Sequence, residues 1–498
     1  MAKIWLLSLL FLIIFLLLAA FKRSKTRQHH KPPSPPGFPI IGNLHQLGEL
    51  HHQSLWKLSK KYGPVMLLKL GKVPMVILSS SETARQALKD HDLSCCSRPS
   101  LVGHRALSYN HRDIAFSPYN DYWKEVRKLA VQELFSTKHV NSIQPIKDEE
   151  VKKLIDLISE SASQKTSVNL SKEFLTLNVS VVCRAAFGVS FDGSNEKINK
   201  LIREAFEMLG SFSASDYNSY IGWIIDWFTG LQGRRERIVR DLDGFYEQMI
   251  DLHNNQEKEQ GSEDFLDMLL RLEKEEAILG KDKLTRNHTK AILMNILLGG
   301  IDSSAITMTW AMAELMRNPR AMKKVQSEIR NQMGNKSMIS LDDVDQLHYL
   351  KMVIKETWRL HPTAPLLVPR EVMSEFEING YTIQPKTRLH VNIWAIGRDP
   401  DSWKDPEEFL PERFMDSNID TKGLNFELLP FGSGRRSCPA MYMGTTMVEF
   451  GLANLLNHFD WNLPEGMVVE DIDTEESPGL TISKKNELIL FPVKYFHH

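Results

Sequence analysis

The sequence predicts a mainly helical protein with a small β region, preceded by one transmembrane helix at its N-terminus. Three observations predict this. From Ser80 onward the spacing of apolar residues is mostly helical. Residues 65–78 read as two short strands around a turn at Gly71-Lys72. Residues 4–21 form an apolar run without charge that is long enough to cross a bilayer.

The composition limits the classes of function. The chain has 498 residues, 42% of them hydrophobic and 25% charged, as expected for a globular protein with a large core. Its net charge of -1 gives no indication of a nucleic acid partner. Four cysteines make no disulfide framework, which predicts a reducing, cytosol-facing environment.

The apolar run predicts an uncleaved membrane anchor over residues 1–22. A core helix would be amphipathic, and a cleaved signal peptide would have a shorter apolar stretch and an Ala-x-Ala-like site. Four basic residues within 22–27 follow the run, whereas only Lys3 precedes it, so the body of the protein should face the cytosol. Residues 23–39 are basic and then proline-rich, which predicts a stiff hinge before a single folded unit over 40–498.

The remaining elements follow in order along the chain. Helical periodicity covers residues 82–91, 120–134, 148–187, 195–252, 289–316 and 441–456, with a polar loop over 257–264. The pattern Ser340-Leu341-Asp342-Asp343 is typical of a helix cap and predicts a helix that continues to Leu360.

A cysteine-bearing loop, residues 430–439, precedes the last helix and reads Pro-Phe-Gly-Ser-Gly-Arg-Arg-Ser-Cys-Pro. Gly432 and Gly434 permit tight, partly left-handed turns, so the backbone can lie flat against a planar ligand. Free amides, arginines and the following helix start all favour an anionic sulfur. We interpret Cys438 as the axial thiolate of a haem iron, with Arg436 able to reach an anionic edge of the same ligand. The alternative is a buried structural cysteine.

The helix over 289–316 contains Gly299-Gly300-Ile301-Asp302-Ser303 at its middle. Each glycine costs roughly 1 kcal/mol relative to alanine, so the pair requires a reason. One reading ends the helix at Gly300 and caps a new one with Asp302 or Ser303. Because apolar residues continue on both sides, we expect one long helix in which the glycines open space for a small ligand.

These two segments resemble the cytochrome P450 superfamily. Phe431, Gly434, Arg436 and Cys438 match its haem loop, Phe-x-x-Gly-x-Arg-x-Cys-x-Gly, with Ala440 at the last position. The glycine helix is similar to the family's oxygen-binding helix, Ala/Gly-Gly-x-Asp/Glu-Thr-Thr/Ser. The resemblance implies that Asp302 and Ser303 relay protons to bound dioxygen. Serine replaces the usual threonine, and its rotamer is less fixed.

Further motifs of the family occur in the expected order. Trp123-x-x-x-Arg127, Arg370 and Arg436 resemble its clamps on the haem propionates, which need neutralising cations in a dry pocket. Taken alone, Trp123 and Arg127 would be a packed surface pair.

Glu356-x-x-Arg359, followed by Arg413 in Pro-Glu-Arg-Phe, resembles the family's buried charged cluster. The resemblance implies a structural role, which is support of the haem loop. The motif alone would be read as a surface ion pair, which contributes only tenths of a kcal/mol.

The resemblance covers essentially the whole chain and is greatest to plant A-type monooxygenases of the endoplasmic reticulum. It implies haem b, O2, and NADPH-derived electrons from a membrane-bound reductase, with cytochrome b5 as a further donor, because no flavin or Rossmann fingerprint is evident. It implies a β region built from the N-terminal strands and segments after Leu360. The substrate would be a small apolar metabolite: a terpenoid, phenylpropanoid, alkaloid precursor or aldoxime.

Two other functions stay open, namely a haem-dependent isomerase or dehydratase without net oxygen insertion, and a non-catalytic haem- or sterol-binding membrane protein. By analogy with the family, the substrate pocket would be lined by Leu101, Phe116, Phe206, Phe212, Leu298, Gly299, Ala305, Leu366, Leu367, Leu480 and Thr481.

Overall fold

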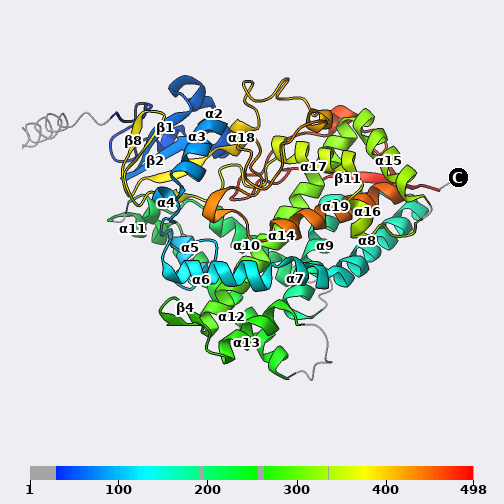
Figure 1. Cartoon of the computed structure of the whole chain (residues 1–498), viewed down its shortest axis with the longest axis horizontal. Coiled ribbons are helices and arrows are strands. Elements are labelled where there is room, and N and C mark those ends of the chain that lie inside the picture. Colours follow the sequence, from blue (N-terminus) through cyan, green and yellow to red (C-terminus); the bar gives the residue numbers. More distant parts are fainter. Residues whose placement is uncertain (1–29, 190–195, 219, 256–262, 335, 497–498) are drawn as a thin grey trace, which may run out of the picture.

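The computed structural model describes residues 30–189, 196–218, 220–255, 263–334 and 336–496 (Figure 1). The predicted transmembrane helix over residues 4–21 and most of the basic stretch after it lie outside these residues. Within the described residues, α14 (Arg286–Arg317) is long and apolar enough to cross a membrane, but 72% of its most apolar segment is buried inside the protein. Helix α14 is therefore a core helix.

A four-stranded sheet with the order β1-β2-β9-β6 lies at the end of the molecule where the described chain begins (Figure 1). Strands β1 (Val65–Leu70) and β2 (Val73–Leu78) form the predicted antiparallel hairpin. Strand β2 pairs in parallel with β9 (Arg388–Val391), which pairs antiparallel with β6 (Arg370–Glu371). The sheet thus joins the N-terminal strands to a late segment, as predicted.

Three smaller sheets complete the β structure of the described residues. They consist of β10 (Phe459–Asn462), β11 (Ile489–Lys494) and β3 (Val168–Asn169); β4 (Ile278–Leu279) with β5 (Asp282–Lys283); and β7 (Phe376–Ile378) with β8 (Tyr381–Ile383).

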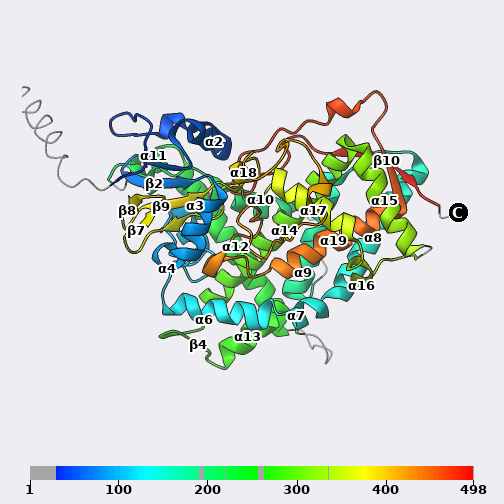
Figure 2. The same cartoon turned by 45° about the horizontal axis from the view of Figure 1, so that its top comes forward.

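Helices form the rest of the protein, and four of them pack together at its centre: α9 (Leu170–Phe187), α14, α17 (His348–Leu360) and α19 (Met441–His458) (Figure 2). The other α-helices are α2 (His51–Tyr62), α3 (Ser81–Arg85), α4 (Asp92–Cys95), α5 (Val102–Leu107), α6 (Asp121–Leu129), α7 (Thr137–Ser142), α8 (Gln144–Gln164), α10 (Glu196–Gly210), α11 (Gly222–Phe228), α12 (Leu231–Asn255), α13 (Phe265–Lys274), α15 (Pro319–Met333), α16 (Leu341–Val344) and α18 (Ile393–Ile396).

Short 3₁₀ and π turns complete the helical structure. The 3₁₀ turns lie at Leu44–Gln46, Ala214–Asp216, Pro411–Phe414, Gly434–Arg436 and Val469–Asp471, and π turns at Gln86–Asp90 and Ala130–Leu134 extend α3 and α6.

Helix α14 runs without a break through its two glycines, which confirms the prediction of one long helix and excludes an end at Gly300. A Cβ atom on Gly300 would lie 3.0 Å from the Val182 side chain of α9, so this glycine permits close packing of the two helices. A Cβ atom on Gly299 would meet no atom within 4 Å. Gly299 therefore leaves open space beside the helix.

The single helix predicted from Ser340 to Leu360 is wrong, because the chain forms two helices there, α16 and α17. The predicted capping box is present, with Ser340 and Asp343 bonding reciprocally. The break follows from a distant partner. The Glu328 carboxylate on α15 accepts hydrogen bonds from the N–H groups of Tyr349 (2.8 Å) and Leu350 (3.0 Å), and so caps the start of α17 from outside its own segment.

Candidate active site

A cavity of about 330 Å³ lies between α14 and the loop that precedes α19. Its α14 wall includes Gly299, Gly300 and Ser303, and the opposite wall includes Phe431 and Cys438. The structure therefore brings the two segments that the sequence singled out to either side of one space.

The cysteine loop has the predicted left-handed turns. Gly432 and Gly434 have φ angles of 67° and 70°. A Cβ atom on Gly434 would lie 2.5 Å from both the Leu88 carbonyl oxygen and a carboxylate oxygen of Asp92, so only glycine fits there. The Cys438 N–H donates to the Phe431 carbonyl at 2.9 Å and closes the loop.

Of the four cysteines, all within the described residues, only Cys438 lines the cavity. Burial raises the pKa of its thiol, whereas a hydrogen bond from the Ala440 N–H and the charge of Arg127 both lower that pKa. Burial raises the pKa of Cys183 to about 12 without any opposing group. Cys438 thus combines a place on the cavity wall with groups that oppose the effect of burial on its pKa.

Arg436 is a buried cation with an unused donor. Its Nε donates to the Cys96 carbonyl (2.8 Å), one terminal nitrogen donates to the Ser117 carbonyl (2.7 Å), and its guanidinium lies 3.9 Å from the Trp123 ring centre. The other terminal nitrogen, Nη1, is buried without a hydrogen-bond partner in the protein. Burial lowers the pKa of Arg436 to about 9. An anion in the cavity would satisfy this group.

The other predicted clamp residues, Trp123, Arg127 and Arg370, also line the cavity, but their side-chain donors are engaged to different degrees. Arg127 makes one long contact, 3.4 Å, to the Ser437 hydroxyl. Arg370 is already committed, because it donates to Asp92 (2.6 Å) and to the Ser433 carbonyl (2.8 Å). The indole N–H of Trp123 is committed as well, to a backbone carbonyl at 2.9 Å.

The sequence analysis missed Arg98, a further buried arginine on the cavity wall. Its guanidinium donates to the carbonyls of Ala115 (2.9 Å), Val368 (2.6 Å) and Pro369 (2.9 Å). No motif surrounds it in the sequence, so no signal was available to find it.

Asn295 of α14 was also missed, although a signal existed, because it is a lone polar residue in an apolar stretch. Its amide oxygen accepts from the N–H groups of Ile114 (2.7 Å) and Ala115 (3.1 Å), and its amide nitrogen donates to Asp113 at 3.1 Å. Asn295, Ile114 and Ala115 all line the cavity. Asn295 therefore fixes the segment 113–116 against α14.

The two residues predicted to relay protons are placed differently. The Ser303 hydroxyl lies on the cavity wall and donates to the Gly299 carbonyl at 2.9 Å. Asp302 is not among the residues lining the cavity, and its carboxylate is hydrogen-bonded to the Thr481 hydroxyl. Burial raises the pKa of Asp302, and the bond from Thr481 opposes that rise.

Three of the predicted pocket residues, Gly299, Leu367 and Thr481, line the cavity. The ring of Phe212 is half-exposed and stacks on Tyr217, so it contributes nothing to this wall. The structure places the following predicted residues off the wall: Leu101, Phe116, Phe206, Phe212, Leu298, Ala305, Leu366 and Leu480.

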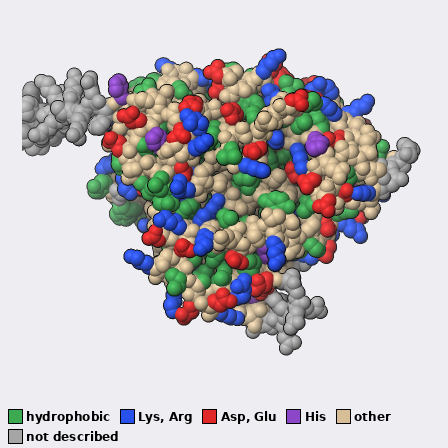
Figure 3. All heavy atoms as spheres, viewed as in Figure 1, with side chains coloured by type: hydrophobic (Ala, Val, Ile, Leu, Met, Phe, Trp, Pro, Cys, Tyr) green, Lys and Arg blue, Asp and Glu red, His purple; other side chains and the backbone are tan. Residues whose placement is uncertain are grey.

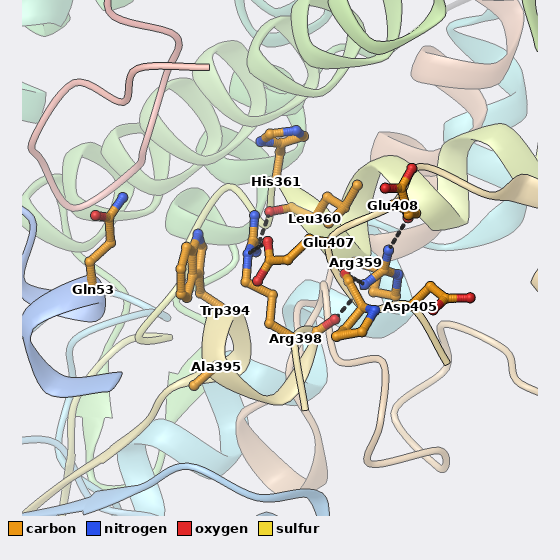
Figure 4. Close-up of polar contacts among 12 residues, drawn as sticks. Gln53, Arg359, Leu360, His361, Trp394, Ala395, Arg398, Asp405, Glu407 and Glu408 are labelled. Atoms are coloured by element: carbon orange, nitrogen blue, oxygen red, sulfur yellow. Dashed lines mark hydrogen bonds and ion pairs between the residues drawn. The ribbon is translucent and has the colours of Figure 1, made fainter. Parts of the chain in front are cut away.

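The predicted charged cluster is present, with Glu356 and Arg359 fully buried and Arg413 10% exposed. Arg359 donates twice to Glu356, at 2.7 and 2.8 Å, and Arg413 donates to the same carboxylate at 2.9 Å. Figure 4 shows Arg359 directed into the loop that carries Asp405 and Glu408, where it also donates to the Glu408 carbonyl at 2.9 Å. Both carboxylate oxygens and both arginines are thus satisfied, as a buried cluster requires.

Trp358 connects this cluster to the cavity. Its ring packs edge-on against Phe431 of the cysteine loop, with ring centres 5.2 Å apart. Its indole N–H donates to the Thr307 hydroxyl of α14 at 3.2 Å. Helix α17 is therefore in contact with both walls of the cavity.

The residues present fit a haem group. Cys438 offers one sulfur ligand, the glycine loop offers a flat backbone, and the open face at Gly299 lies opposite. Arg436 and Arg127 hold unused donors that suit carboxylates in a buried site.

Comparison with known proteins agrees with this geometry. The family model described as Cytochrome P450 matches residues 32–491. Cytochrome P450 71B26 of Arabidopsis thaliana is 74% identical over 501 residues and 100% of both chains. Cytochrome P450 71B6 of the same plant is 50% identical over 465 residues, 93% of this chain and 92% of that protein.

Among solved structures, a zebra fish cytochrome P450 with abiraterone has a TM-score of 0.76 and 22% identity, covering 89% of this chain and 100% of that chain, which shows the fold. From its matched family model, its relatives and its fold, this chain belongs to the cytochrome P450 family of haem-thiolate oxidoreductases, in the A-type class of plants.

Proposed function

We propose that this protein is a monooxygenase that uses O2 and NADPH-derived electrons to oxidise a small apolar plant metabolite, such as a terpenoid, phenylpropanoid, alkaloid precursor or aldoxime. The observation that carries this proposal is the cavity in which Cys438 lies opposite the open helix face at Gly299. Ile114, Ile296 and Val368 contribute apolar side chains to the wall, which suits an apolar ligand better than a charged one.

In this proposal Cys438 would hold the haem iron, and Arg127 and Arg436 would hold the haem carboxylates. Bound haem supplies the activation of oxygen. The protein's own contribution begins with the Ala440 N–H and the Arg127 charge, which stabilise the anionic sulfur. The cluster of Glu356, Arg359 and Arg413 would support the loop through the contact of α17 with Phe431.

On the opposite wall, the missing Cβ atom of Gly299 leaves room for a small molecule beside α14. Ser303 directs its hydroxyl proton to the Gly299 carbonyl and leaves its oxygen lone pairs able to accept a bond from that molecule. Burial raises the pKa of the Asp302 carboxyl, which favours its protonated form. The apolar part of the wall would exclude water from the cavity.

We assign the supply of electrons to an NADPH–cytochrome reductase, with cytochrome b5 as a further donor. Arg435, within the cysteine loop, and Lys124 of α6 are both about half-exposed and both lie close to Tyr119. Each is paired with a carboxylate, Asp92 and Asp121 respectively, and we place the acidic partner on this surface because the two cations are its exposed basic groups near Cys438.

We also propose that the chain is anchored in the endoplasmic reticulum membrane with this domain facing the cytosol. Trp223, Trp227 and Phe228 of α11 are 59%, 61% and 75% exposed, and Figure 3 shows hydrophobic side chains gathered at the left edge over this helix. Asn218 and Ile221, just before α11, line the same hollow as Phe38, Ile40 and Gly42, a few residues after the described chain begins at residue 30. Exposed tryptophans near the start of the described chain support contact with the lipid interface.

The test uses membranes that contain this protein and a plant reductase, incubated with a pooled extract of small apolar metabolites with and without NADPH. Products one oxygen heavier, formed only with NADPH and absent with Cys438→Ser, would support monooxygenation and identify the substrate class. Products that form without NADPH, or that have lost water, would instead favour a rearrangement or dehydration.

A further inference from the structure

Asp302 and Thr481 form a pair that joins two distant parts of the chain. Asp302 lies on α14, and Thr481 lies on the loop between Ser477 and Ser483 near the C-terminus. The Thr481 hydroxyl is the hydrogen-bond partner of the Asp302 side chain, and among the described residues Asp302 forms no ion pair. The pair is therefore a carboxyl group and a hydroxyl group without a cation.

The loop that carries Thr481 is held firmly in place. The Ile482 N–H donates to the Thr363 carbonyl, and the Ser477 N–H donates to the Ser483 carbonyl, both at 2.8 Å. On its other side the loop touches α10, where a Cβ atom on Gly210 would lie 2.6 Å from the Leu480 nitrogen. The position of the Thr481 hydroxyl is thus set by backbone contacts.

Asp302 and Thr481 differ in their position relative to the cavity. Thr481 lines the cavity, whereas Asp302 does not. Ser303, the neighbour of Asp302, also lines the cavity, but its hydroxyl proton is engaged with the Gly299 carbonyl. Thr481 is consequently a residue that contacts Asp302 through its hydroxyl and also lines the cavity.

We propose that Thr481 transfers protons between the Asp302 carboxyl and an oxygen-bearing group in the cavity. This inference rests on the proposed monooxygenase function, because it assigns the source of the protons that reduced oxygen takes up. This assigns to the Thr481 hydroxyl the role that resemblance to the family gives to the hydroxyl at position 303. The route runs from Asp302 on α14 through the C-terminal loop that carries Thr481.

The transfer balances without another reactant. In the structure the Thr481 hydroxyl donates to Asp302. For the transfer, this hydroxyl turns its proton toward the acceptor in the cavity and releases it there, while the protonated Asp302 carboxyl donates its proton to the Thr481 oxygen. The Thr481 hydroxyl is restored, and the Asp302 carboxylate then takes a new proton from water. A hydroxyl suits this role because it donates and accepts at the same atom.

The rate of proton supply decides whether reduced oxygen leaves the cavity as hydrogen peroxide or as water. Release as hydrogen peroxide consumes two electrons and two protons per O2, whereas reduction to two waters consumes four of each. Slower proton delivery therefore raises the share of peroxide. This share can be measured without an organic substrate, by following NADPH, O2 and peroxide in membranes that contain the full chain and a reductase.

The decisive variants are Thr481→Val, which keeps the shape but removes the hydroxyl, and Thr481→Ser, which keeps the hydroxyl. We expect Thr481→Val to raise the peroxide share several-fold and Thr481→Ser to restore the wild-type share. Ser303→Ala should change it less than Thr481→Val does. The proposal is overturned if the peroxide share of Thr481→Val equals that of the wild type, or if Thr481→Ser raises this share as much as Thr481→Val does. Should the valine variant not retain haem, Thr481→Ala against Thr481→Ser gives the same comparison.

A second measurement does not depend on turnover. Infrared difference spectra of the ferric protein over a pH series report the carboxyl band of Asp302, assigned by its loss in Asp302→Asn. Removing the hydrogen bond from Thr481 should move this titration to higher pH in Thr481→Val, and an unchanged midpoint would contradict the pairing. If the wild type consumes no O2 with NADPH, the proposed function fails, and the infrared result still decides whether Thr481 controls Asp302.

Discussion

Replacing Glu356 by glutamine should strongly destabilise the protein. Glu356 accepts four hydrogen bonds, two from Arg359, one from Arg413 and one from the Leu410 N–H, and it is fully buried together with Arg359. The variant leaves two guanidinium groups without a counter-charge and turns an amide nitrogen toward their donors. Breaking a buried ion pair in this way costs about 3–5 kcal/mol. That is a large part of the roughly 5–15 kcal/mol that stabilises a typical protein.

The chain supplies its own control. Glu82 and Arg85 have the same i, i+3 spacing and the same two-pronged contact, at 3.0 and 2.8 Å, but their side chains are 59% and 39% exposed. Glu82→Gln should therefore leave stability almost unchanged, because water replaces the lost contact. The assay is the urea midpoint followed by tryptophan fluorescence, together with the half-life of the haem absorbance at raised temperature. The reasoning from burial is refuted if Glu356→Gln changes the urea midpoint and the haem half-life no more than Glu82→Gln does.

Three further predictions concern the cavity. Cys438→Ser should abolish the thiolate-type absorption of the carbon monoxide complex, whereas Cys183→Ser should retain it. Asn295→Leu should weaken azole binding, measured by Soret titration, by about tenfold, because three hydrogen bonds to segment 113–116 are lost. Asn178→Leu is the matched control, because this amide also lines the cavity but donates only within its own helix, and equal effects would contradict the prediction. Burial lowers the pKa of Lys147 from 10.5 to about 8, so its charge destabilises the fold below pH 8 and this effect disappears as pH rises toward 10.5. Lys147→Met should therefore be more stable than the wild type at neutral pH by about 3 kcal/mol. Its stability should also lack the increase that the wild type shows as pH rises toward 10.5, which unfolding measured over a pH series would test.

The two glutamate motifs show where sequence reasoning stops. Glu82-Thr-Ala-Arg85 and Glu356-Thr-Trp-Arg359 differ at one position, yet one lies on the surface and the other in the core. Spacing predicts the contact within each pair, because residues three apart share a helix face. Burial depends on which other elements cover that face, and only the family motif identified the second pair as the buried one.

Other features depended on partners far away in the sequence. The hairpin, the unbroken α14 and the left-handed glycines of the cysteine loop follow from local chemistry, and the structure confirms them. The break before α17 could not be predicted, because its cap comes from Glu328 of another helix. The contact of Asp302 with Thr481 likewise spans 179 positions.

The parallel pairing of β2 with β9 has a consequence for how the chain is made. Leu78 and Val391 are partners in the register, so the 312 residues between them must be synthesised before the two can pair. At a synthesis rate of roughly 5–20 residues per second, the hairpin waits about 15–60 s for its neighbour. During that interval β2 has an uncovered edge, which is the kind of surface that recruits other strands. Chaperone protection of the nascent hairpin therefore belongs to the biosynthesis of this fold, and a ribosome-bound chain that ends before residue 388 should show it.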